Sequence, residues 1–66
     1  MYRFLVGYHY RFPYDERHLL NHYGRVECDA NSMQEAYTIV EDVMTEAMEA
    51  VGADYLHIDS IRIIDW

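Results

Sequence analysis

The fold of this chain is decided by residues 32–52, which read SMQEAYTIVEDVMTEAMEAVG. Successive helical residues lie about 100° apart, and on that spacing the apolar residues share one broad arc while the acids lie opposite. A capping box, Ser32-Met33-Gln34-Glu35, marks the start of the helix, and Gly52 suits the left-handed conformation that ends one. We predict an amphipathic helix from Ser32 to Val51 whose apolar arc forms core: Met33, Ala36, Ile39, Val40, Val43, Met44, Ala47, Ala50 and Val51.

Two strand patterns precede this helix. Residues 2–12 carry aromatic or apolar side chains at every even position, an alternation that is typical of a β-strand. Pro13 cannot donate to a sheet, so it ends the run, and a long polar connection follows. A second strand is predicted over residues 23–29, with Val26 and Cys28 sharing one face.

A third strand follows the helix over residues 55–64, which are β-rich and contain no breaker. Its alternation slips between Ile58 and Ile61, which predicts either a β-bulge near Asp59 or Ser60 or partial cover on both faces of the strand. The resulting order is ββαβ, and the first strand is the most apolar, which places it centrally. We predict one α+β domain over residues 1–66, with a three-stranded antiparallel sheet in the order 2-1-3 and the helix packed on one face. The other face and both edges are open for interaction.

Charge is distributed unevenly along the chain. The sequence has 12 acids, five arginines and no lysine, with a net charge of −7. Residues 1–28 have a net charge of +1, whereas residues 29–66 carry nine acids against Arg62 alone, a net charge of −8. Binding to nucleic acid or to an anionic membrane surface needs a cationic patch. Positively charged protein partners are therefore favoured.

The cysteine count and the hydropathy of the chain predict the cellular compartment of the protein. Cys28 is the only cysteine, so no intrachain disulfide can form, which suits a reducing environment. We interpret it as a small buried apolar residue on a strand rather than a reactive thiol. No apolar stretch reaches the length of a signal segment or a membrane span. We expect a cytoplasmic protein.

The sequence contains no convincing catalytic or metal motif. His18 and His22 are four residues apart, as a chelating pair on one helical turn would be, but a structural zinc site needs four ligands. Glycine-rich phosphate loops and nucleophile elbows are absent, and the acids follow a solvent-facing stripe rather than a cleft. We therefore expect no metal, no cofactor and no enzymatic activity.

Two surfaces remain as binding candidates. The open sheet face, carrying Arg3, His9 and Arg11 beside aromatic residues, could imitate an RNA-stacking platform, although the net charge argues against it. The acidic stripe of the helix is either an ordinary solvated face or a row of carboxylates that mimics phosphates in the basic groove of a partner.

The pattern VECDANSMQEAYTIVEDVM at residues 26–44, followed by DYLHIDSIRII at residues 54–64, resembles small acidic phage-encoded inhibitors of host machinery. Phage inhibitors of host RNA polymerase have a similar strand-helix-strand portion, and some anti-CRISPR proteins are similar in size and charge. In the polymerase inhibitors, arginines on the last strand contact the enzyme. The resemblance implies that role for Arg62, the only matching arginine here.

These observations lead to one functional hypothesis and one alternative. The hypothesis is a protein-binding inhibitor, of the anti-CRISPR or RNA polymerase inhibitor type, that occupies a basic surface of a host nucleic-acid-handling complex and acts as a nucleic-acid mimic. Its predicted partner-binding residues are Glu35, Glu41, Asp42, Glu46, Glu49 and Arg62. The alternative is a small accessory or self-assembling module that dimerises through its open sheet face or an edge strand, with Leu5, Tyr55 and Trp66 as contacts.

Overall fold

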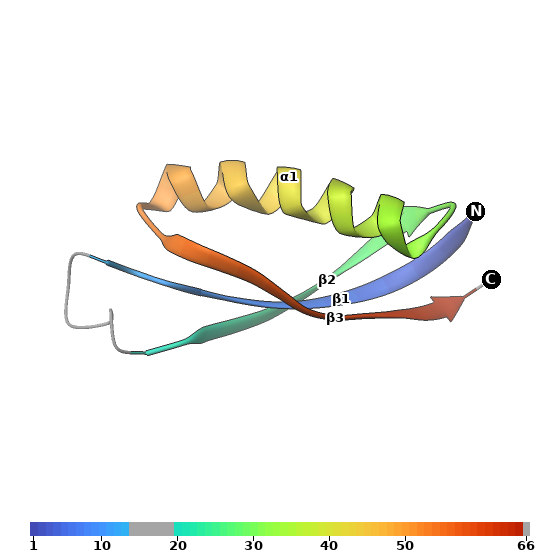
Figure 1. The fold of residues 1–66 in the computed structure, drawn as a ribbon, viewed down its shortest axis with the longest axis horizontal. Helices are drawn as coiled ribbons and strands as arrows, with labels where there is room; N and C mark the ends of the chain where they lie inside the picture. Colours follow the sequence, from blue (N-terminus) through green and yellow to red (C-terminus); the bar gives the residue numbers. More distant parts are fainter. Residues whose placement is uncertain (14–19, 66) are drawn as a thin grey trace.

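The computed structural model describes residues 1–13 and 20–65 and contains one sheet and one helix (Figure 1). Its elements are, in chain order, β1 Tyr2–Arg11, β2 His22–Ala30, α1 Met33–Val51 and β3 Asp54–Asp65. The sheet is antiparallel in the order β2-β1-β3, and α1 runs along one of its faces. The predicted α+β fold and strand order are confirmed. No helix in the described ranges is long and apolar enough to cross a membrane.

The core forms where the middle of the sheet meets α1. Phe4 and Val6 of β1 are 1% and 0% exposed, and they pack with Ala30, Ala36 and Val40. Their neighbours in the sheet are half-buried apolar residues, including Val26 and Cys28 of β2 and Ile61 of β3. Side chains alternate along a strand, so the odd-numbered residues of β1 face away from α1.

Both ends of α1 are capped as the sequence predicts. Glu35 N–H donates to Ser32 Oγ at 3.1 Å, while Glu35 Oε1 accepts from Asn31 N–H at 3.4 Å. At the other end Gly52 has φ 74°, and Ala53 N–H donates to Met48 O at 2.9 Å. These bonds satisfy backbone groups that a helix end leaves without partners.

β3 contains a bulge, which was one of the two alternatives that the sequence predicted. Gly7 is in register with Ser60 and Tyr8 with Ile58, so Asp59 is the extra residue. The pairing of β1 with β3 shifts at two further places, Arg3/Phe4 and His9/Arg11. β3 is therefore an irregular strand along its whole length.

The prediction that the entire apolar arc of α1 is core was wrong. Only Ala36 and Val40 of that arc are buried and Met44 is half-buried, whereas Ile39, Val43, Met33 and Val51 are 38%, 59%, 53% and 61% exposed; Ala47 and Ala50 are exposed too. Met48, which the predicted arc omitted, is buried. The covered residues are four apart, Ala36, Val40, Met44 and Met48, because a three-stranded sheet is narrow and supports a single ridge of the helix.

Candidate interaction surfaces

An acidic surface lies on the side of α1 that points away from the sheet. Glu41, Asp42, Glu46 and Glu49 are all exposed, and on the helical spacing Glu41 lies on a flank, about 100° from the buried Val40. Interaction with the neighbouring Glu41 carboxylate raises the pKa of the Tyr37 phenol above its ordinary value. None of the four carboxylates forms an ion pair with an arginine or histidine of the described residues. The acidic surface is therefore available to a cationic partner.

The other two predicted partner-binding residues occupy different environments. Glu35 is half-buried and its carboxylate binds the Asn31 amide, so it helps to hold the start of the helix. Arg62 is exposed and lies in register with Leu5 of β1. That register places Arg62 on the sheet face opposite α1. The structure brings the five predicted acids together on the helix and separates Arg62 from them.

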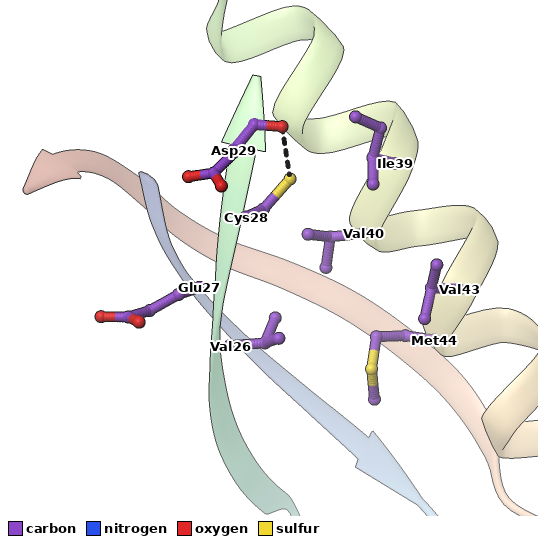
Figure 2. A pocket seen from close by; sticks show the side chains of 8 residues that line it. All are labelled: Val26, Glu27, Cys28, Asp29, Ile39, Val40, Val43 and Met44. Carbon is purple, nitrogen blue, oxygen red and sulfur yellow. Dashed lines mark hydrogen bonds between the residues drawn. The ribbon is translucent and has the colours of Figure 1, made fainter. Parts of the chain in front are cut away.

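An apolar groove of about 250 Å³ lies between α1 and β2 (Figure 2). Val26 and Cys28 form its β2 side, while Ile39, Val40, Val43 and Met44 form its helix side. The carboxylates of Glu27 and Asp29 point away from the helix, so the interior of the groove is apolar (Figure 2). Sequence reasoning missed this groove. The available signal was an apolar arc too broad for one narrow sheet to cover.

Cys28 is half-buried in the wall of this groove. Its Sγ lies 3.7 Å from the carbonyl oxygen of Asp29. Burial raises the pKa of the thiol, and the nearby charges of Asp29 and Glu35 raise it further. A raised pKa disfavours the thiolate, which is the nucleophilic form. The structure thus agrees with the interpretation of Cys28 as an apolar strand residue.

The open sheet face carries balanced charges. Arg3 Nε donates to Asp29 Oδ1 at 3.1 Å, and this hydrogen bond holds the pKa of Asp29 below its ordinary value. Arg25, Glu27 and Arg62 are also exposed. A mixed and largely polar face offers little apolar area for pairing. Of the contacts predicted for self-assembly, Leu5 is half-buried on this face, Tyr55 is 66% exposed at the start of β3, and Trp66 lies outside the described residues.

A histidine cluster occupies the same face near the far end of β1. His9 Nδ1 lies 2.8 Å from both carboxylate oxygens of Asp59, and its ring centroid lies 5.2 Å from that of His57 and 5.6 Å from that of Tyr23. His57 Nε2 is 4.0 Å from Asp59 Oδ1. The pairing of β1 with β3 brings these groups together although they are remote in sequence.

No described residues form a group of three or more histidine, cysteine or acidic side chains arranged to hold a metal ion. His18 of the candidate chelating pair lies outside the described residues. His22 instead stacks on Tyr10, with 5.5 Å between ring centroids, and meets Phe12 edge-on at 5.1 Å. His22 therefore belongs to an aromatic cluster at the end of the β1–β2 hairpin.

Comparisons with protein-family models, with curated proteins and with solved structures find no match for this chain. The resemblance to phage-encoded inhibitors stays a prediction from sequence pattern. Function is therefore inferred from the exposed surfaces of the molecule, of which the acidic surface of α1 and the apolar groove beside β2 are the most distinctive.

Proposed function

We propose that this protein is a small acidic protein-binding inhibitor that occupies a basic surface of a nucleic-acid-handling complex, acting by stoichiometric binding and without catalysis. The observation that carries the proposal is the acidic surface of α1, whose carboxylates are exposed and have no cationic partner among the described residues. A capped helix holds these charges in a fixed row, so little conformational entropy is lost when a partner binds them.

The spacing of the charges supports competition with nucleic acid. At 1.5 Å per residue, the four acids of the acidic surface, from Glu41 to Glu49, span about 12 Å, which is a mean spacing of about 4 Å along the helix axis. One strand of nucleic acid carries a phosphate for roughly every 3.4 Å of its axis. The helix therefore presents a charge density close to that of a single strand and well below that of a duplex.

The net charge of the chain favours a protein as the partner. The chain has no lysine and a net charge of −7, so phosphate backbones and anionic membranes repel it. A cationic protein groove attracts it instead and accelerates encounter, an effect that falls as salt rises. We expect the association rate constant to decrease steeply with ionic strength.

Charge reversal of the acidic surface tests the proposal. The triple variant Asp42→Lys, Glu46→Lys and Glu49→Lys should abolish partner binding and leave the circular dichroism spectrum unchanged, because all three side chains are exposed. A milder pair, Glu46→Gln with Glu49→Gln, has a control of equal charge change on β3, Asp54→Asn with Asp65→Asn. In Asp54→Asn the side-chain amide retains an oxygen that can accept the hydrogen bond from the Tyr55 N–H. Equal loss of affinity in both pairs would contradict the proposal.

The partner is identified by affinity capture from nuclease-treated bacterial lysate followed by mass spectrometry. The captured protein is then mixed with a fluorescent oligonucleotide that it binds, and this chain is added while anisotropy is recorded. We expect displacement at one chain per site, with the reversed triple variant inactive. Capture of a partner whose oligonucleotide stays bound at saturation would show that the acidic surface does not compete with nucleic acid.

A further inference from the structure

Within residues 1–13 and 20–65 no strand pairs with the outer edge of β2, and the strand is regular. β2 is the terminal strand of the sheet, and its nine residues pair with β1 without a register shift. Such an edge presents a row of unpaired backbone N–H and C=O groups to solvent, which natural proteins normally block with bulges, proline or lysine. The strand reads HYGRVECDA and has no bulge, proline or lysine, and its charged side chains are Arg25, Glu27 and Asp29. Its backbone is available to another strand.

The apolar groove between α1 and β2 lies directly beside this free edge (Figure 2). Val43 and Ile39 remain 59% and 38% exposed on its helix side although they belong to the apolar arc of α1. An edge strand and an adjacent apolar surface on the same side of the molecule form one continuous docking surface. Whatever strand joins β2 can bring its own apolar layer to cover the groove.

The sequence of β2 is complementary to itself around Val26. When two copies of β2 run antiparallel with Val26 opposite Val26, Arg25 of each copy lies opposite Glu27 of the other. Two exposed pairs of opposite charge are thus formed, one on each side of the symmetry axis. On the other face of the sheet, Gly24 of each copy lies opposite the half-buried Cys28 of the other copy, and glycine has no side chain to collide with it. Opposite charges directly across an antiparallel pair stabilise it, and like charges destabilise it.

We propose that a second copy of this chain covers the groove, with the two β2 strands paired antiparallel about a two-fold axis at Val26. The dimer has a continuous six-stranded sheet with both helices on one face. In Figure 2 Val43 and Met44 lie across the groove from Val26, so we expect the axis to bring the Val43 side chains of the two copies toward each other. The interface is isologous, as in most homodimers.

The area that a stable dimer must bury is known from other complexes. A standard interface buries about 800 Å² on each partner, roughly a sixth of the 4801 Å² surface of the described chain. Because each chain carries −7, the two copies repel at long range, and salt screens that repulsion. The dimer should therefore persist at high salt, unlike the charge-driven binding by the acidic surface.

Exchange of the two charged residues tests the register. In Arg25→Glu each new glutamate faces Glu27 of the other copy, and in Glu27→Arg each new arginine faces Arg25, so each single variant should raise the dimer Kd about tenfold. The double variant Arg25→Glu with Glu27→Arg restores both opposite pairs and should return the Kd to within about threefold of the original. Both side chains are exposed in the single chain, so circular dichroism should not change.

Mixing the two single variants gives the sharpest readout. Arg25→Glu presents only glutamates and Glu27→Arg only arginines, so the two chains should form a heterodimer tighter than either homodimer, as measured by sedimentation equilibrium. Val43→Lys places a charge in the groove and should dissociate the dimer, whereas its control Thr45→Lys, on the polar side of α1, should not. The proposal is overturned if the original chain is monomeric, or if the dimer Kd is the same in all charge variants.

Discussion

The two edges of the sheet differ in ways that decide which one can accept a partner. β2 pairs with β1 in unbroken register, whereas the pairing of β3 shifts at three places and includes the bulge at Asp59. Both edge strands carry charged side chains, so the regularity of the pairing distinguishes them. Bulges are one means by which natural sheets block edge-to-edge pairing. β3 is therefore a protected edge and β2 an open one.

The same asymmetry is visible in the helix above them. Val40 is 3% exposed and Val43 is 59% exposed, although both belong to the apolar arc of α1. Ile58 and Ile61 of β3 pack against the core under the helix. On the β2 side the helix is separated from the strand by the apolar groove. One flank of α1 is therefore packed and the other is uncovered.

The largest effect on stability is expected at a residue of β1 that pairs with both edge strands. Phe4 is 1% exposed on β1 and lies in register with Cys28 of β2 and Ile63 of β3. Phe4→Ala should lower the free energy of unfolding by about 3–5 kcal/mol, because it leaves a cavity at the centre of a small core. Urea denaturation followed by circular dichroism measures the change. A loss below about 1 kcal/mol would contradict the central packing of β1.

The two flanks of α1 can be compared by one chemical change at two sites. Val40→Ala removes buried methyl groups and should lower the free energy of unfolding by about 2 kcal/mol, whereas Val43→Ala should cost less than about 0.5 kcal/mol in dilute, monomeric protein. At high protein concentration the difference in the free energy of unfolding between the two variants should become smaller, because Val43→Ala also weakens the dimer. Equal costs at low concentration would show that the groove is already covered within one chain.

Two glycines, one near each edge strand, should differ in how well they tolerate an added methyl group, with a smaller effect on stability. A Cβ on Gly24 of β2 would lie 2.5 Å from the Tyr8 ring, whereas one on Gly7 would lie 2.7 Å from Ser60 Oγ of β3. Ser60 can rotate its hydroxyl away, but Tyr8 must move a ring that stacks on Tyr10. We expect Gly24→Ala to cost about 1 kcal/mol and Gly7→Ala less than about 0.5 kcal/mol in thermal unfolding. The reverse order would place the tighter contact at β3.

The smallest effect concerns the ion pair at the end of β2. Arg3 lowers the folded-state pKa of Asp29, so the pair adds stability above the ordinary pKa of an aspartate and loses it as the pH falls through the folded value. Both side chains are exposed, so the contribution to stability is small. Arg3→Gln should raise the pKa of Asp29 toward its ordinary value in an NMR titration of the carboxyl group. An unchanged titration would mean that the pair does not persist in solution.

Local signals in the sequence were sufficient for most of the fold. The capping box, Gly52 and the slip between Ile58 and Ile61 predicted the helix ends and the bulge, because each depends on residues close together in the chain. Alternation and the apolar first strand predicted the sheet order. The acidic surface followed from helical periodicity alone.

Features that depend on distant residues were not predictable in the same way. The approach of His9 to His57 and Asp59 needs the register of β1 with β3, which residue patterns did not determine. The buried role of Met48 and the exposure of Val43 depend on where the narrow sheet ends beneath the helix. Helical periodicity gives the direction of a side chain but not the width of the surface that covers it.

The most direct test of the open β2 edge is the mass of the unmodified chain in solution. Sedimentation equilibrium at about 1 M NaCl screens the acidic surface, with a Debye length of about 3 Å, while apolar contacts persist. We predict a mass twice the 7.9 kDa of one chain, with the dimer no weaker than at low salt. A mass of 7.9 kDa at every concentration and salt would contradict the account.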